Sequence, residues 1–157
     1  MSFWFIIMVK VNIEVIQKLR DATGAGVMSC KKAYAEANGD FDKAAAIIKE
    51  WGLAKVEQKS DRSTGAGLLK TYIHNDRVGV MLELRCETDF VARSDVFKGL
   101  AHNLVMQIAA MGPADVDILL SQPYIKDETI AINDLVKDAI ARVGENIRIE
   151  RFCRYEI

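Results

Sequence analysis

The chain has 157 residues and a mass of 17.5 kDa, which allows one medium domain or a small and a medium one and excludes a large multidomain enzyme. Half of the residues are apolar and 27% are charged, so a folded core can form and wholesale disorder is excluded. With 21 basic and 22 acidic residues, the formal charge is -1 and provides no cationic field for a phosphate backbone. We therefore expect no direct binding of nucleic acid.

The N-terminus and the cysteines restrict the compartment. Residues 3–9 form an apolar run much shorter than the ~18 residues of a membrane-spanning helix, without the flanks of a secretory signal. We interpret residues 1–8 as an apolar extension outside the native structure and expect no membrane span. Cys30, Cys86 and Cys153 are too few and too scattered for a disulfide framework. A reducing, cytoplasmic location follows as a prediction.

Residues 9–53 are predicted to form a three-helix module of about 40 residues, near the lower limit for independent folding. Apolar residues recur at three- and four-residue spacing, and glycine interrupts this spacing repeatedly, which predicts helix ends. The predicted helices start near Asn12, Val27 and Phe41 and end at the glycines that follow them: the loop 23–26, Gly39 and Gly52.

The loop at residues 23–26, Thr-Gly-Ala-Gly, is interpreted as a plain interhelical turn. Glycines before a helix can bind phosphate, but this loop lacks the Lys-Ser/Thr pair and the preceding strand of a phosphate-binding loop. Val27 and Met28 follow the loop and cannot both face so small a core. One of them is expected to contact another protein.

A polar stretch at residues 54–66 is predicted to be a linker with a frayed helical start, followed by a core domain at residues 67–157. Within this core, residues 67–74 and 78–86 flank a short turn at 75–77, and in residues 78–86 every even position is apolar, which predicts a β-hairpin. One face of such a hairpin is apolar and must be covered.

Two helices are predicted to cover that face. The first begins near Ser94 or Asp95 and ends at Gly112-Pro113, and the second covers residues 132–143 before Gly144. A final strand at residues 147–157 is expected to place five residues on one face: Ile147, Ile149, Cys153, Tyr155 and Ile157. The order predicts an α+β fold, with an antiparallel three-stranded sheet packed with helices.

No catalytic site emerges from the residues. His74, Cys86 and Asp89 could suggest a thiol triad, but Cys86 lies on the apolar face of its strand, where burial raises the pKa of a thiol. His74 and His102 are the only histidines, and no pair of residues has metal-ligand spacing. We expect no catalytic residue, no metal and no cofactor.

The tip, residues 88–91 (Thr88, Asp89, Phe90 and Val91), follows a strand directly and precedes a helix directly. A solvated turn has no compositional reason to contain phenylalanine, so Phe90 either folds back into the core or is presented outward. From the residues alone, the inward placement is favoured.

Several segments resemble the elongation factor Ts family. They are Cys-Glu-Thr-Asp-Phe-Val-Ala-Arg at residues 86–93, Thr-Gly-Ala-Gly-Val-Met-Ser-Cys-Lys-Lys-Ala at 23–33, and Arg-Val-Gly-Glu-Asn-Ile at 142–147. Tyr-Ile-His at 72–74 and Arg-Val-Gly-Val at 77–80 are further family segments, and the resemblance runs over about residues 8–156. Several ordered and unusual segments make chance similarity a poor explanation.

The resemblance implies a guanine-nucleotide exchange factor for elongation factor Tu, which releases GDP without making or breaking a bond. It implies that the three-helix module, similar to ubiquitin-associated domains, docks on the GTPase. Carried to matching positions, this docking face is Leu19, Arg20, Val27 and Met28. The tip would press near the magnesium and switch region, which reverses the inward placement of Phe90.

Longer members of the family carry two core halves, so this short chain is expected to pair as a homodimer through an exposed apolar sheet face. Cys153 is a candidate for that interface, as an intermolecular disulfide or as a buried free thiol.

The rival function is a peptide- or ubiquitin-like-binding adaptor that uses the three-helix module and has no exchange activity.

Overall fold

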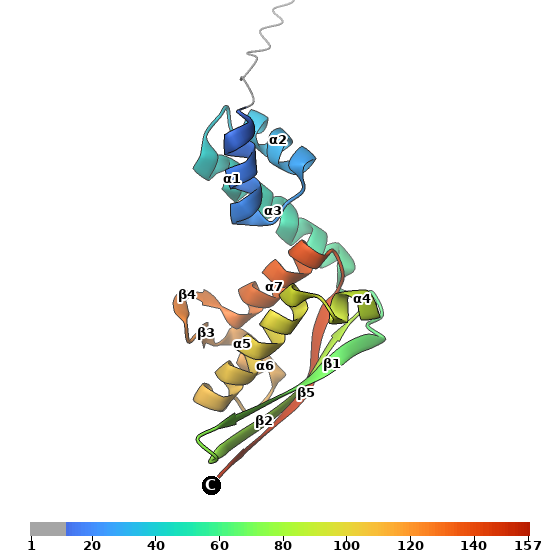
Figure 1. The fold of residues 1–157 in the computed structure, drawn as a ribbon, viewed down its shortest axis with the longest axis vertical. Helices are drawn as coiled ribbons and strands as arrows, with labels where there is room; N and C mark the ends of the chain where they lie inside the picture. Colours follow the sequence, from blue (N-terminus) through green and yellow to red (C-terminus); the bar gives the residue numbers. More distant parts are fainter. Residues whose placement is uncertain (1–11) are drawn as a thin grey trace, which may run out of the picture. The chain divides into compact units, whose positions relative to one another are not determined.

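The computed structural model describes residues 12–157, so the predicted extension at residues 1–8 lies outside the described residues. The chain divides into two compact units, one that ends at Ala54 and one that covers Lys55–Ile157. Each unit has its own hydrophobic core, and we describe them separately (Figure 1).

The first unit contains helices α1 (Ile13–Thr23) and α2 (Val27–Glu36) and most of α3 (Phe41–Lys59). The Asn12 side chain caps α1 by accepting from the backbone N–H of Glu14, and Gly24 ends the helix with φ at 69°. A small core of apolar residues joins the helices: Ile16, Leu19, Cys30, Ala33, Ala37, Ala44 and Ile48. Three helices are thus present where the glycine spacing predicted them.

Helix α3 does not end at Gly52, where the sequence predicted its end, but continues to Lys59. A glycine inside a helix costs only about 1 kcal/mol relative to alanine, and burial of an apolar residue further along can offset this. Val56 provides that burial, since it is 7% exposed and belongs to the core of the second unit. The stretch expected to be a linker at residues 54–66 is therefore helical as far as Lys59.

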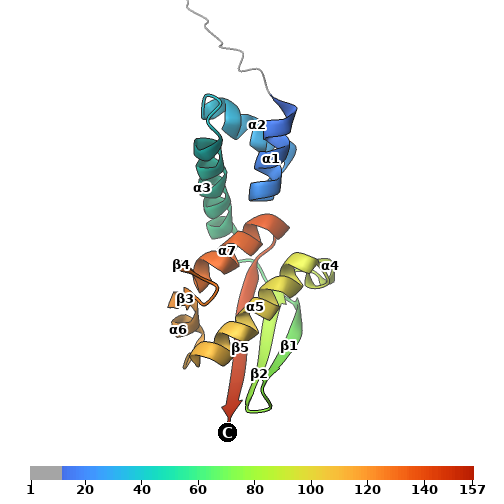
Figure 2. The same cartoon turned by 60° about the vertical axis from the view of Figure 1, so that its left-hand side comes forward.

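The second unit is built on an antiparallel sheet in the order β1-β2-β5, with strands Ala66–His74, Val78–Cys86 and Ile147–Glu156. Helices α5 (Asp95–Met111) and α7 (Ile132–Val143) cover one face of this sheet, and Figures 1 and 2 show the other face free of helices. The predicted α+β class is confirmed. Four smaller elements complete the unit: α4 (Asp89–Ala92), α6 (Val116–Ser121), β3 (Pro123–Tyr124) and β4 (Asp127–Ala131).

Helix α5 is the centre of this core. Its N-cap is Ser94, whose hydroxyl accepts from the backbone N–H of Phe97, and Gly112 ends it with φ at 54°. Phe97, Leu104 and Ile108 on its inner face have no exposed surface. The apolar stripe and both ends of the helix agree with the sequence prediction. The buried stripe packs against the sheet and holds it in place.

The last strand contains a bulge that the sequence prediction missed. In β5, Ile149 lies opposite Leu84 while Arg151 lies opposite Glu83, so Glu150 is an extra residue. An extra residue exchanges the two faces of a strand. As a result Phe152 packs against the core while Cys153 and Tyr155 lie on the outer face, instead of sharing one face with Ile147 and Ile149.

Candidate functional site

The tip is a single turn of helix between two rigid elements. Strand β2 ends at Cys86, and α4 covers only Asp89–Ala92 before α5 begins at Asp95. Thr88 is the N-cap of α4, with an extended backbone and a hydroxyl oxygen that accepts from the N–H of Val91 at 3.4 Å. The sequence therefore places a helix start directly at the end of a strand.

One side of this turn is buried and the other is exposed. Val91 and Ala92 are 5% and 7% exposed and belong to the core, whereas Phe90 is 85% exposed and Asp89 is exposed as well. A single helical turn can bury only one side against the sheet, and the apolar pair Val91 and Ala92 occupies it. The inward placement of Phe90 that the residues alone favoured is therefore contradicted.

Thr88 is fixed by hydrogen bonds to its backbone and to its side chain. Its carbonyl oxygen accepts from the Cys86 thiol at 3.2 Å, and its hydroxyl donates to the Glu145 carboxylate at 2.6 Å. Sequence reasoning gave Glu145 no role, because a contact between residues 57 positions apart leaves no local pattern. The only available signal was its place in the family segment 142–147.

The suggested thiol triad is not assembled. The pairing register places Cys86 opposite Ala66 and His74 opposite Val78, at the two ends of the β1–β2 hairpin. Burial raises the pKa of the Cys86 thiol, and the carboxylates of Glu145 and Asp89 raise it further. A buried thiol with a raised pKa is a poor nucleophile, as the sequence analysis expected.

Among residues 12–157, no group of three or more metal-ligating side chains is arranged to hold an ion. Over the same residues, no helix is both long and apolar enough to cross a bilayer.

The predicted docking residues of the first unit separate into two sets. Leu19 has no exposed surface and packs in the core of its own unit, so it cannot itself contact a partner. Arg20 is exposed, Val27 is 41% exposed and Met28 is 75% exposed. Leu19 therefore drops out of the predicted docking set, and Arg20, Val27 and Met28 are the members that are exposed.

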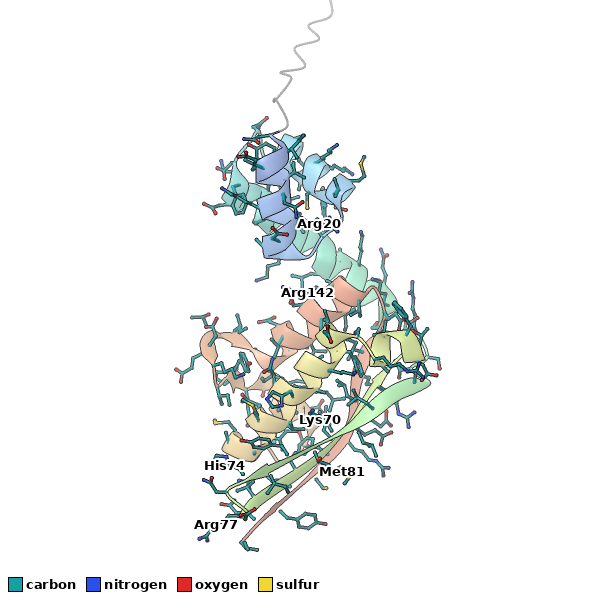
Figure 3. All side chains as sticks on the ribbon, viewed as in Figure 1. Arg20, Lys70, His74, Arg77, Met81 and Arg142 are labelled. Atoms are coloured by element: carbon teal, nitrogen blue, oxygen red, sulfur yellow. The ribbon has the colours of Figure 1, made fainter. Side chains whose placement is uncertain are left out.

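The outer face of the sheet carries exposed apolar residues that nothing in the described chain covers. Leu69 and Ile73 on β1, Met81 on β2 and Tyr155 on β5 are 66%, 63%, 47% and 75% exposed. Figure 3 shows Met81 on the side of the sheet away from the helices, and Cys153 is its direct neighbour on β5. We call these five residues the outer sheet patch.

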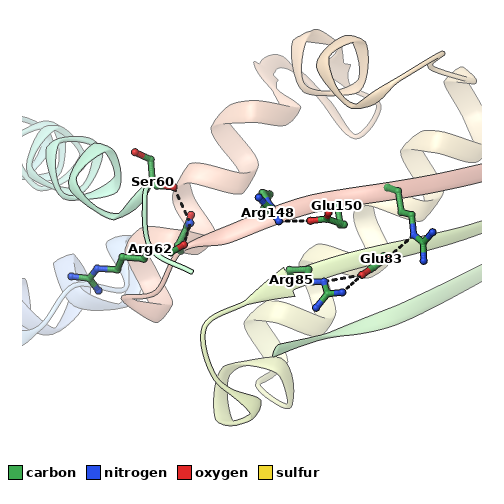
Figure 4. A network of polar contacts seen from close by, with 8 residues as sticks. Ser60, Arg62, Glu83, Arg85, Arg148 and Glu150 are labelled. Carbon is green, nitrogen blue, oxygen red and sulfur yellow. Dashed lines mark hydrogen bonds and ion pairs between the residues drawn. The ribbon is translucent and has the colours of Figure 1, made fainter. Parts of the chain in front are cut away.

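An ionic group lies beside this patch. Glu83 accepts from Arg151 at 2.7 Å and from Arg85 at 2.7 Å (Figure 4). These bonds, first that of Arg151 and then that of Arg85, hold the pKa of the Glu83 carboxyl below its usual value. The outer face therefore combines apolar residues with charges of both signs.

Comparisons with known proteins agree on one family. The sequence profile described as Elongation factor TS matches residues 87–157, which include the tip and its supports. The elongation factor Ts of Thermotoga maritima is 41% identical in an alignment 192 positions long, which covers 94% of this chain and 96% of the relative. That of Oleidesulfovibrio alaskensis is 38% identical over 196 aligned residues, with 96% and 99% covered.

A chloroplastic elongation factor Ts from Cyanidioschyzon merolae is 41% identical over 191 aligned residues, which cover 90% of this chain and 91% of the relative. In each case the aligned length exceeds the 157 residues of the chain. These relatives therefore contain residues that have no counterpart here.

Proposed function

The chain belongs to the elongation factor Ts family, and from this premise we propose that it drives GDP from elongation factor Tu with the tip at residues 88–91. As a member of this family it is a nucleotide exchange factor and not an enzyme. In the proposed mechanism, Asp89 and Phe90 enter the magnesium and switch region of the GTPase. GDP then leaves and GTP can bind.

The observation that carries this proposal is the 85% exposure of Phe90 on a turn whose other side is anchored in the core. Moving a large aromatic side chain out of water lowers the free energy, and the fold of this chain does not bury Phe90. A projecting aromatic residue on a fixed mount is suited to displacing a segment of another protein.

The energetics require more than Phe90. A factor that weakens GDP binding ~10⁴-fold needs about 5.5 kcal/mol of preference for the nucleotide-free GTPase. Burial of one phenylalanine provides only about 1.5–3 kcal/mol. Asp89 adds a negative charge beside the phosphates and the magnesium ligands, and the remaining preference comes from other surfaces of the factor.

The first unit is proposed to supply docking affinity. Arg20, Val27 and Met28 are exposed and would make the contact, whereas Leu19 packs in the core of the unit. Met28, at 75% exposed, is an unbranched and adaptable side chain that suits a contact surface. Met28→Ala is expected to weaken binding to the GTPase without changing the release rate at saturating factor.

The deciding experiment is stopped-flow release of a fluorescent GDP analogue from elongation factor Tu. The chain is expected to accelerate release, and an Asp89→Ala, Phe90→Ala double variant is expected to lose most of this effect. Absence of acceleration by the wild-type chain, together with binding of a peptide or a ubiquitin-like protein, would instead support the adaptor function.

Exchange involves neither nucleic acid nor a membrane. The cytoplasmic location stays a prediction, since one relative is chloroplastic.

We also propose that two copies of the chain pair through the outer sheet patch. The helices cover only one face of the sheet, and the relatives contain residues that this chain lacks, so a second copy is a natural source of cover. A two-fold interface must be complementary to itself. The patch meets this condition, because apolar residues can face their own copies while Glu83 and Arg151 can face each other across the axis.

Met81 and Cys153 lie side by side near the middle of this face, so Cys153 is expected at the interface. Sedimentation equilibrium tests the proposal: the wild-type chain is expected to have the mass of two chains at micromolar concentration, and Met81→Glu that of one. A wild-type mass of one chain would contradict pairing. Measurement with and without a reductant decides between a disulfide and a free thiol.

A further inference from the structure

Glu145 lies between α7 and β5, and its carboxylate accepts three hydrogen bonds from Thr88, the first residue of the tip, and from Glu87 directly before it. Oε2 accepts from the backbone N–H of Glu87 at 3.1 Å and from that of Thr88 at 3.0 Å. Oε1 accepts from the Thr88 hydroxyl at 2.6 Å. Hydrogen bonds to an ionised acceptor are roughly twice as strong as neutral ones. One carboxylate therefore fixes both the backbone and the side chain of Thr88.

The neighbouring residue Asn146 completes the connection. Its backbone N–H donates to the Glu87 carboxylate at 2.8 Å, and its side-chain amide donates to the carbonyl oxygens of Ser60 and Arg62 at 3.2 and 3.0 Å (Figure 4). Asn146 is 7% exposed, so these bonds are shielded from water. We call Glu87, Thr88, Glu145 and Asn146 the tip clasp.

Helix α4 needs such a support. A helix of four residues has no stability of its own, because nucleation costs more than one turn of hydrogen bonds returns. Val91 and Ala92 attach the turn to the core through apolar contacts, which are not directional. Hydrogen bonds are directional, and those of Thr88 therefore set the orientation of the turn. Phe90 is too exposed to contribute.

We propose that Glu145 is a positioning residue for nucleotide exchange, which holds α4 through the tip clasp so that Asp89 and Phe90 project from the core. This inference rests on the proposed function of the tip. Without Glu145 the turn samples other orientations, and the apparent activity falls with the fraction of tips that are correctly oriented. Docking by the first unit does not involve these contacts and is left unchanged.

The test compares Glu145→Ala with Glu145→Gln in the stopped-flow release assay on the full chain. Alanine removes all three acceptor contacts, and we expect roughly a tenfold fall in the release rate at saturating factor, with an unchanged half-saturating concentration. Glutamine retains a carbonyl oxygen for the two backbone donors, and Thr88 can rotate to accept from its amide group. We therefore expect Glu145→Gln to recover most of the rate. Glu150→Ala, which removes an ion-paired carboxylate within β5 and away from the tip clasp, is the matched control and is expected to be unchanged.

A double-mutant cycle separates positioning from a merely structural role. If Glu145 acts through its contacts with Thr88, Thr88→Val lowers the rate much less in the Glu145→Ala background than in the wild-type chain. Equal effects of Thr88→Val in both backgrounds, or a wild-type rate for Glu145→Ala, would overturn the inference while the proposed function stands. A wild-type chain without exchange activity would instead defeat the proposed function itself.

If Glu145→Ala does not fold, Thr88→Val provides the same test. It removes the hydroxyl that donates to Glu145 and caps α4, whereas Thr88→Ser retains it. We expect Thr88→Val to lower the release rate at saturating factor and Thr88→Ser to retain it. A folded Thr88→Val variant with the wild-type rate would overturn the inference.

Discussion

Phe90 and Phe97 lie seven positions apart in one segment and are expected to respond in opposite ways to replacement by alanine. Phe90 is 85% exposed, and Phe97 has no exposed surface and packs beneath the sheet. Phe90→Ala removes no contact with the core, so its free energy of unfolding should stay within about 0.5 kcal/mol of the wild-type value. Phe97→Ala leaves a cavity and should lose about 3–5 kcal/mol.

The effect on exchange should be the reverse. If Phe90 is buried on the GTPase during exchange, its loss removes about 1.5–3 kcal/mol of preference for the nucleotide-free form, which corresponds to roughly a 10- to 100-fold slower release of GDP. Phe97→Ala, measured at a temperature where it remains folded, should retain a rate much closer to that of the wild-type chain.

Urea titration followed by circular dichroism gives the stability, and stopped-flow fluorescence gives the release rate for the same preparations. Ile118→Ala, on α6 and at a residue 44% exposed, is the control for loss of an exposed apolar side chain. A Phe90→Ala variant that releases GDP at the wild-type rate would refute the reasoning. So would one that loses several kcal/mol of stability, since Phe90 would then belong to the core.

Three further predictions concern the sheet and the thiols. Gly67→Ala should lower the midpoint of thermal unfolding, because a Cβ atom there would overlap the backbone carbonyl oxygen of Leu84; an unchanged midpoint would contradict the close approach of β1 and β2. The pKa of Glu83 is lowered in the folded chain, so its contribution to stability is present above the unfolded pKa and is lost as the pH falls through the lower folded value. Glu83→Gln should therefore be less stable than the wild-type chain at pH 7, and the difference should shrink as the pH falls through the lowered pKa of Glu83; a difference that does not shrink in acid would count against this origin. In the Met81→Glu variant, a thiol reagent at neutral pH should modify Cys153 rapidly and leave buried Cys30 and Cys86 unmodified; rapid modification of a second thiol per chain would contradict their burial.

The elements with strong local patterns could be predicted from the sequence. Helix α5 followed from its apolar stripe and from Ser94 and Gly112 at its ends, and the β1–β2 hairpin followed from the short turn and from the apolar even positions of its second strand. In these segments the local pattern and the tertiary packing agree, so the local signal is sufficient.

Where tertiary packing determines the outcome, the sequence prediction failed. Helix α3 passes Gly52 because Val56 is buried further along, and the bulge in β5 depends on its pairing with β2. Leu19 matched a family position for docking, yet the helix face on which it lies is the buried one. None of these facts is encoded in a short window of residues.

The candidate site was found only in part. The tip was identified from its place after a strand, but the orientation of Phe90 could not be derived from the residues alone, because burying or exposing one side of a single turn depends on what covers it. The tip clasp left no trace in the pattern, since Glu145 and Thr88 meet only in the folded chain.

The central claim is that the projecting tip couples binding of this factor to loss of GDP, and such coupling is reciprocal. Isothermal titration of the factor into nucleotide-free and into GDP-bound elongation factor Tu measures it directly. The wild-type chain is expected to bind the nucleotide-free form far more tightly, and Phe90→Ala should reduce that ratio of affinities. Equal affinities of the wild-type chain for the two forms would contradict the account.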